Sequence, residues 1–301
     1  MPTNEGSGPM TLPTTDTTWV TRRWLDVPYA TMSPAQTLDV YLPDDGDGPF
    51  PLIVGIHGGA FRMGTSRNRE MAPIIESVRR GYAVASINYR LSGEAIFPAQ
   101  VADCWAAIRF LLANAAKWHL DGDRVVVWGP SAGGYVAAMV GAAGHVAEFD
   151  GDHSVVGAGS ITVRAVVDWY GPIDFGHMDA QFEASTIAPR LGPKSDSDSP
   201  ESELLGAPVD DVLDLVRVAN PSTHLGGMTP ATAPHFLIQH GTDDPLIPTQ
   251  QSIGFASAVA AALGPSMVEI DVLPGAGHGG APFEAPANLD RIHAFIAAAL
   301  R

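Results

Sequence analysis

A short segment near the middle of the chain combines a strand, a tight turn and a helix. Residues 125–134 read VVVWGPSAGG, a β-branched run followed by the pattern GxSxG. Side chains at Gly129 or Gly133 would meet neighbouring backbone in so tight a turn, so small residues are needed there. An alanine-rich, helix-like stretch follows at 135–143. The segment predicts a sharp strand-to-helix turn that exposes Ser131 Oγ at the top of a sheet, and a turn serine without chemistry is the alternative.

The spacing of apolar residues predicts an α/β fold. Segments 52–57 and 124–128 are almost wholly apolar, as parallel strands covered on both faces are, whereas 19–27 and 37–42 alternate like half-exposed antiparallel strands. We therefore expect a mostly parallel central sheet flanked by helices, with antiparallel strands at its start. Further strands are expected at 83–89, 165–170, 235–239 and 268–273, and a final helix at 287–301 is expected to close one face.

Composition divides the chain into a tail, a domain and an insertion. Residues 1–18 are rich in Thr, Pro and Gly and are expected to form a flexible tail before a domain at 19–301. Ser, Asp and Pro dominate 176–225, which we interpret as an insertion with an exposed charged loop at 194–202 and a short helix at 209–218. Such insertions lie over the ligand crevice, so a lid or pocket wall is predicted. A solvated loop without function is the alternative for 194–202.

The chain is strongly acidic, with 33 Asp and Glu against 17 Lys and Arg and a formal net charge of −16. Nucleic acid and anionic membranes would be repelled by such a surface, so neither is expected as a partner. The single cysteine, Cys104, excludes an intrachain disulfide and is expected to be buried in a helix. The start of the chain has no signal-like segment and no apolar run has transmembrane length, so a cytoplasmic location is expected; a homodimer is left open.

A serine nucleophile needs a base, an acid that orients the base, and donors for an oxyanion. His278 lies in the glycine-rich segment PGAGHGG after the expected strand 268–273 and is the predicted base. Asp244 follows the strand 235–239 in the segment HGTDDPLIP and is the predicted acid, with the adjacent Asp243 as the alternative. The chain order of serine, aspartate and histidine is that of the α/β-hydrolases.

The segment HGGAF at 57–61 directly follows the expected strand 52–56. Its small residues let backbone amides approach a substrate oxygen, so the amides of Gly59 and Ala60, together with that of Ala132, are the predicted oxyanion hole. His57 is expected to brace this turn. A glycine turn without function is the alternative.

With these residues in place, the chain resembles carboxylesterases of the α/β-hydrolase superfamily. Within it, the chain is similar to the group that includes hormone-sensitive lipase and the bacterial feruloyl and acetyl-xylan esterase-like (BD-FAE) proteins. The likeness covers about residues 30–301, but HGGA replaces the usual HGGG and Pro130 stands where Asp or Gly is frequent. Further matching blocks lie at 87–92, 97–100, 170–174, 199–206 and 220–224.

The resemblance implies the α/β-hydrolase fold with an inserted lid, and a serine carboxylesterase that acts on a small-molecule substrate. Short- to medium-chain or aryl carboxylic esters would be hydrolysed through an acyl-enzyme, with no metal or organic cofactor. Two alternatives remain open: an amidase or arylformamidase with the same triad, and an inactive hydrolase fold that serves as a binding module.

Overall fold

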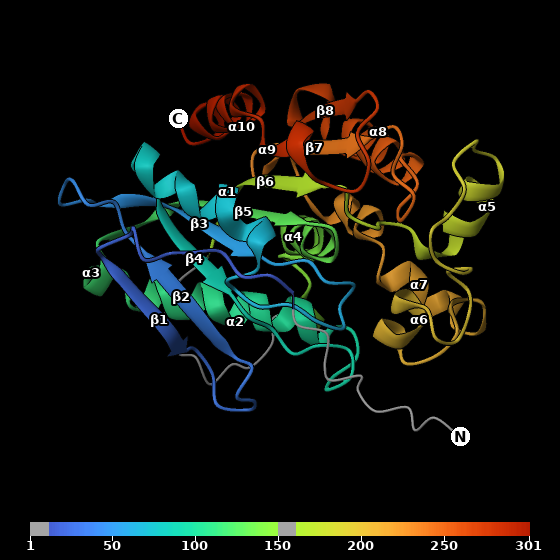
Figure 1. Cartoon of the computed structure of the whole chain (residues 1–301), viewed down its shortest axis with the longest axis horizontal. Helices are drawn as coiled ribbons and strands as arrows, with labels where there is room; N and C mark the ends of the chain where they lie inside the picture. Colours follow the sequence, from blue (N-terminus) through green and yellow to red (C-terminus); the bar gives the residue numbers. More distant parts are fainter. Residues whose placement is uncertain (1–11, 150–160) are drawn as a thin grey trace, which may run out of the picture.

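The computed structural model describes residues 12–149 and 161–301, and the eight strands of this part of the chain form one sheet (Figure 1). The strand order is β1-β2-β4-β3-β5-β6-β7-β8. Strand β2 pairs antiparallel with β1 and β4, and all other neighbours are parallel, which confirms the expected sheet. The strands are β1 Arg23–Pro28, β2 Thr37–Tyr41, β3 Phe50–Ile56, β4 Ala83–Ile87, β5 Leu120–Pro130, β6 Val163–Trp169, β7 His235–Gly241 and β8 Val268–Leu273.

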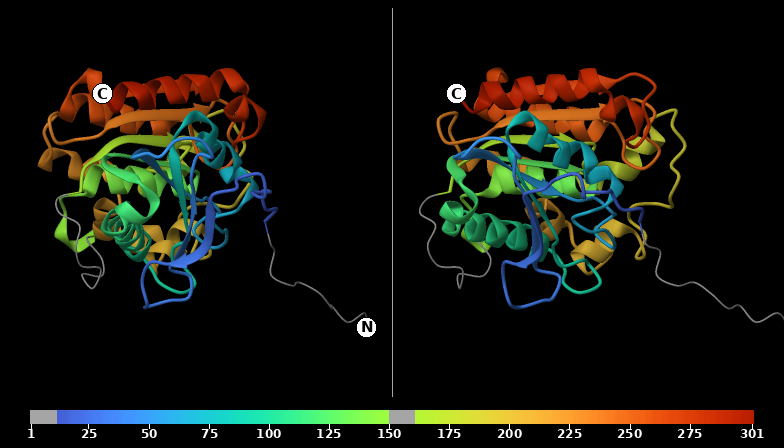
Figure 2. Two further views of the ribbon diagram at one scale, coloured as in Figure 1. Left: turned by 90° about the vertical axis from the view of Figure 1, so that its left-hand side faces the viewer. Right: turned by 60° about the vertical axis from the view of Figure 1, so that its left-hand side comes forward.

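Helices cover both faces of the sheet, and Figure 2 shows α10 on one face and α2 and α4 on the other. Side chains of a buried strand alternate between two cores, so Val54 of β3 lies in the core beside α2 and α4, while Ile53 lies in the core beside α10. Cys104 of α2 is buried, as expected. The α-helices are α1 Ala72–Ile75, α2 Ala99–Ala113, α3 Ala115–Trp118, α4 Ala132–Ala143, α5 Met178–Glu183, α6 Pro200–Leu205, α7 Leu213–Val218, α8 Gln250–Leu263, α9 Ala281–Glu284 and α10 Pro286–Ala299; the 3₁₀ helices are η1 Arg69–Met71, η2 Glu76–Arg80, η3 Ala147–Phe149, η4 Phe175–His177, η5 Val209–Asp211, η6 Pro221–Gly227 and η7 Pro265–Met267.

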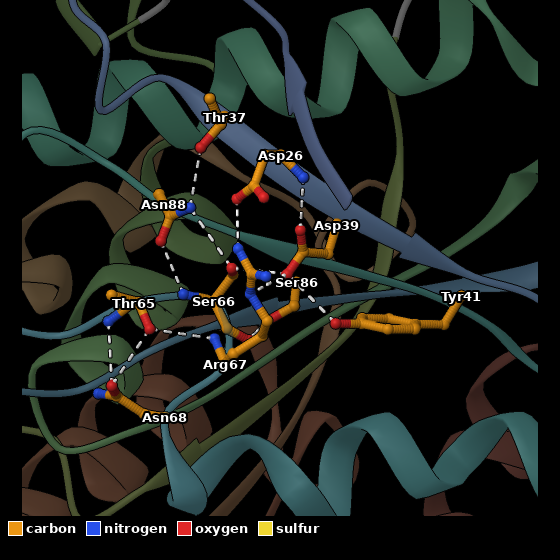
Figure 3. Close-up of polar contacts among 10 residues, drawn as sticks. All are labelled: Asp26, Thr37, Asp39, Tyr41, Thr65, Ser66, Arg67, Asn68, Ser86 and Asn88. Atoms are coloured by element: carbon orange, nitrogen blue, oxygen red, sulfur yellow. Dashed lines mark hydrogen bonds and ion pairs between the residues drawn. The ribbon is translucent and has the colours of Figure 1, made fainter. Parts of the chain in front are cut away.

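The prediction that segment 37–42 is half exposed was wrong. Strand β2 lies between β1 and β4, and its polar position, Asp39, is completely buried. The Asp39 carboxylate accepts hydrogen bonds from the Asp26 amide (2.8 Å) and the Ser66 hydroxyl (2.8 Å), and it pairs with Arg67 at 3.2 Å (Figure 3). Enough donors converge on this carboxylate to offset its desolvation, so a polar residue in an alternating pattern occupies the interior.

Residues 176–225 gather at one end of the sheet, beyond the arrowheads of β5 and β6 (Figure 1). The expected helix at 209–218 is divided into η5 and α7, because Val212 between them has a non-helical φ of −131°. The loop 194–202 was wrongly predicted to be exposed throughout, since Lys194, Ser199 and Glu201 are buried. Ser199 Oγ caps α6 through the Ser202 amide at 3.0 Å and donates to the Lys194 carbonyl at 2.6 Å.

The described end of the amino-terminal segment runs along the loop before η1. Thr14 forms an antiparallel bridge with Asn68, and the Arg69 amide donates to the Pro13 carbonyl at 2.7 Å. Residues 1–11 of the expected tail lie outside the described residues. In the described part of the chain, no helix is both long and apolar enough to cross a bilayer.

Two glycines test how tightly helices pack on this sheet. A Cβ on Gly141 of α4 would lie 2.3 Å from Val166 Cγ2 of β6, whereas one on Gly254 of α8 would meet no atom within 4 Å. We expect Gly141→Ala to lower the free energy of unfolding by about 1–3 kcal/mol through overpacking. Gly254→Ala should raise it by about 1 kcal/mol through helix propensity. Urea denaturation of both variants measures these changes, and a stable Gly141→Ala protein would contradict the packing argument.

The buried Asp168 of β6 predicts a pH-dependent stability. Burial raises the pKa of Asp168 from 3.8 to about 6, although the hydrogen bond from the Gly171 amide and the nearby His240 oppose this shift. The folded state therefore binds more protons than the unfolded state between about pH 4 and 6, and stability falls as the pH rises through this window. Asp168→Asn should gain up to about 3 kcal/mol over wild type between pH 4 and 7. Urea unfolding at both pH values measures this gain, and a constant difference would refute it.

Candidate active site

Ser131 occupies a strained turn between β5 and α4. Its φ of 54° and ψ of −124° lie in a region that L residues rarely adopt, and its amide donates to the Trp169 carbonyl at 2.7 Å. A Cβ on Gly129 would lie 2.3 Å from Gly133 C, and one on Gly133 would lie 2.0 Å from the Ile56 carbonyl oxygen. These two positions tolerate only glycine, which is the steric requirement that the sequence pattern predicts.

The structure brings Ser131, His278 and Asp244 together from three separate loops. His278 Nδ1 lies 2.7 Å from Asp244 Oδ2, and His278 Nε2 lies 2.9 Å from Ser131 Oγ. An ionised carboxylate can only accept, so Nδ1 carries the proton and Nε2 is left to accept from the serine hydroxyl. Asp243 is exposed, and its carboxylate accepts from the neighbouring Thr242 hydroxyl at 2.7 Å. Of the two adjacent aspartates, only Asp244 contacts the histidine.

Asp244 is held as a buried carboxylate by four donors. Its Oδ1 accepts from the amides of Leu246 (2.8 Å) and Ile247 (3.0 Å), while Oδ2 lies 2.7 Å from His278 Nδ1 and 3.2 Å from His240 Nε2. Burial acts to raise the pKa of Asp244, but the hydrogen bonds and charges of His240 and His278 outweigh it and hold the pKa well below its usual value. The carboxylate is therefore ionised at neutral pH.

The turn after β3 lies beside the serine. A Cβ on Gly58 would lie 3.3 Å from Ser131 Cβ, and Gly59 has a φ of 114°. The Gly59 carbonyl accepts from the amides of Arg62 (3.0 Å) and Met63 (3.1 Å), while the amides of Gly59 and Ala60 donate to no other group in residues 12–149 and 161–301. These amides keep hydrogen-bonding capacity that a bound oxygen could use.

The replacement of the last glycine of HGGG by Ala60 has a backbone consequence that the sequence alone does not show. An alanine replaces glycine without strain only when φ is negative, and the φ of Ala60 is 54°. The following residue, Phe61, also has a positive φ of 62°. Ala60 is therefore held in a left-handed conformation that its Cβ disfavours and that glycine would adopt more readily.

His57 stabilises this turn through contacts of its ring and its carbonyl group. Its ring stacks on Tyr89 with centroids 4.4 Å apart, and its Nδ1 lies 2.7 Å from the Gly58 carbonyl oxygen. The Tyr89 hydroxyl donates to the His57 carbonyl at 2.9 Å. Burial lowers the pKa of His57 to about 4, so the ring is neutral at pH 7 and donates to Gly58.

Three further residues at this site were not predicted from the sequence. Glu70 accepts from the Gly58 amide at 2.7 Å, Tyr170 has its ring centroid 4.6 Å from that of His278, and His240 contacts the Asp244 carboxylate. His240 directly follows the expected strand 235–239 and lies four residues before Asp244, a separation that could have indicated this contact. Glu70 lies well after the HGGA turn in the sequence, and this separation does not indicate that the two are in contact.

Among the residues whose structure is described, no group of three or more His, Cys, Asp or Glu side chains is arranged to hold a metal ion. The groups that converge on Ser131 are a histidine, a carboxylate and backbone amides, the set used for acyl transfer by a serine.

Comparisons with known proteins assign the chain to a family. The family model BD-FAE matches residues 38–259. The chain is similar to the esterase LipC of Mycobacterium tuberculosis, with 29% identity over 82% of this chain and 57% of LipC. The esterase LipQ of the same organism is 28% identical over 84% of this chain and 56% of LipQ. The chain thus spans little more than half the length of these curated relatives.

A solved structure extends the similarity over nearly the full length of both chains. A truncated carbohydrate esterase from gut microbiota superposes with a TM-score of 0.80 at 28% identity, covering 95% of this chain and 99% of that one. The sheet order, the strained serine turn and the family match all point to the same fold. The chain belongs to the BD-FAE family and has the α/β-hydrolase fold.

Proposed function

We propose that this protein is a serine carboxylesterase. The observation that carries the proposal is the chain of contacts from Ser131 Oγ through His278 to Asp244, which starts in a strained turn beside two unengaged amides. The names of LipC, LipQ and the carbohydrate esterase support ester hydrolysis as the reaction class. Short- to medium-chain or aryl carboxylic esters are the proposed substrates, and the name of the carbohydrate esterase adds esterified sugars to the substrates worth testing.

In the proposed acylation step, Ser131 Oγ attacks the ester carbonyl carbon as its proton moves to His278 Nε2. The carbonyl π electrons move to the oxygen, and the amides of Gly59, Ala60 and Ala132 donate to the oxyanion. The tetrahedral intermediate collapses, the bond to the alcohol oxygen breaks, and His278 returns the proton to that oxygen. Asp244 keeps the imidazole in the required tautomer and stabilises its protonated form.

Deacylation repeats the sequence with water as the nucleophile. His278 Nε2 takes a proton from the water as its oxygen attacks the acyl-enzyme carbonyl. The bond to Ser131 Oγ then breaks, and the proton passes to that oxygen, which releases the carboxylic acid and restores the free serine.

The test is hydrolysis of a p-nitrophenyl ester series, an acetylated sugar and an N-formylarylamine by the wild type and Ser131→Ala. We expect ester hydrolysis that is lost at acid pH, because a protonated His278 cannot accept the serine proton. Ser131→Ala should lower kcat/KM by at least about 10⁴-fold. Ser257→Ala, an exposed serine on α8, is the matched control. Activity that survives Ser131→Ala would overturn the proposal, and faster cleavage of the formamide would replace esterase by amidase.

We further propose that residues 176–225 form a wall of the substrate pocket. Arg62, one residue after the HGGAF turn, pairs with Glu203 of α6 at 2.5 Å and donates to the Asp198 carbonyl. Phe175, directly before this segment, packs on Tyr135 of α4 with ring centroids 5.0 Å apart, and the Tyr135 hydroxyl donates to the Ala219 carbonyl at 2.8 Å. The inserted segment is thus attached to both the turn and the helix that flank the serine.

Removal of the Arg62 side-chain charge tests this attachment. Arg62→Gln should raise KM for longer acyl chains about 3- to 10-fold with little change in kcat, because the wall loses an ion pair worth up to about 1 kcal/mol and its carbonyl contact. Arg80→Gln, which removes a comparable exposed ion pair to Asp290, is the control. Steady-state kinetics over the ester series measure the effect. Equal KM values for Arg62→Gln and wild type at every chain length would contradict the pocket wall.

A further inference from the structure

A second carboxylate lies beside the serine, and the proposed reaction assigns it no role. Glu70 belongs to η1, and its Oε1 accepts from the Gly58 amide at 2.7 Å. A Cβ on Gly58 would lie 2.8 Å from Glu70 Oε1 and 3.3 Å from Ser131 Cβ. Glu70, the HGGA turn and the serine therefore pack in one layer, and Pro130, directly before the serine, carries no charge.

We propose that Glu70 is a positioning residue of the active site: it fixes the HGGA turn through the Gly58 amide and places a carboxylate beside Ser131, the residue that His278 contacts. This inference rests on the proposed serine hydrolase function. It assigns to Glu70 a part in ordering the oxyanion hole and in stabilising the protonated histidine that forms as the serine attacks.

The hydrogen bond to Gly58 accounts for the first part of this role. With the Gly58 amide engaged by Glu70, the next two amides, those of Gly59 and Ala60, donate to no group in the described residues. A flip of the peptide before Gly58 would break a charge-assisted hydrogen bond at 2.7 Å. Glu70 therefore keeps the turn in the conformation that leaves these amides free for a substrate oxygen.

The electrostatic surroundings account for the second part. Glu70 Oε1 is bonded to the Gly58 amide, Gly58 packs against Ser131, and Ser131 Oγ lies 2.9 Å from His278 Nε2. Burial raises the pKa of Glu70, whereas the hydrogen bond from the Gly58 amide, the Asn68 side chain and the charge of His278 lower it. The other titratable groups that face His278 are Asp244, which accepts from Nδ1, and Tyr170, whose ring lies against the imidazole. His240 and Glu284 act one shell further out, on Asp244 and Tyr170 respectively. A negative charge at Glu70 favours the imidazolium over the neutral ring.

The loop before Glu70 is anchored well enough to hold the carboxylate in place. Figure 3 shows the polar cluster in which Arg67 pairs with the buried Asp39 and Ser66 donates to it. The Asn68 carboxamide oxygen accepts from the Thr65 amide at 3.1 Å. These contacts join the loop to β2, so Glu70 projects from a fixed backbone.

Two substitutions separate the two parts of the role. Glu70→Gln keeps an acceptor for the Gly58 amide and removes the charge, so kcat should fall about 5- to 10-fold and the acid limb of the kcat/KM profile should move to lower pH. Glu70→Ala removes the acceptor as well, so kcat should fall about 100-fold with KM within about twofold of wild type. Glu76→Gln, an exposed glutamate in η2, is the matched control.

Activity is expressed per serine labelled by an alkyl fluorophosphonate, so loss of folded protein does not count as loss of catalysis. The labelling rate of Ser131 across pH gives a second readout that requires no ester substrate, and it should slow in both Glu70 variants. The role of Glu70 alone would be overturned if Ser131→Ala is inactive while both Glu70→Gln and Glu70→Ala keep the wild-type kcat, labelling rate and acid limb of the pH profile. A wild-type protein that neither hydrolyses esters nor labels at Ser131 would overturn the proposed function and this inference with it.

Discussion

The close approach of the first turn of α4 to the end of β3 is the contact on which the site depends. Gly133 lies so near the Ile56 carbonyl that no side chain fits between them. This contact sets Ser131 directly beside Gly58, and thereby makes the turn after β3 and the turn after β5 two walls of one site. The parallel order β4-β3-β5-β6 is what brings these carboxyl ends to the same edge.

Backbone strain is concentrated around this contact. Six non-glycine residues of the described chain have positive φ, and four of them, Ala60, Phe61, Ser131 and Tyr170, belong to the candidate site or directly adjoin it. Each such residue costs on the order of 1–3 kcal/mol and persists only where its surroundings over-determine it. The two buried cores, one on each face of the sheet, supply that constraint. The strained conformation of the site therefore depends on the packing of the whole fold.

The sequence predicts best what short segments determine. All eight strands, the turn around Ser131 and the loops of Asp244 and His278 follow from apolar runs and glycine spacing, because these patterns reflect contacts between near neighbours or with the sheet itself. Glu70 and Asp39 could not be assigned in this way, since their surroundings come from distant parts of the chain. Lys194 and Ser199 show a different limit: a polar run is buried because its own capping bonds and packing satisfy it.

The pairing of Pro13 to Thr15 with the loop at 67–69 has a consequence for protein engineering. Those residues make backbone hydrogen bonds one and three positions before Glu70. A deletion or a fusion at the amino-terminal side of the domain therefore acts on the same backbone that carries the second carboxylate. For the design of variants, residues 13–15 belong with the framework of the candidate site and not with a removable extension.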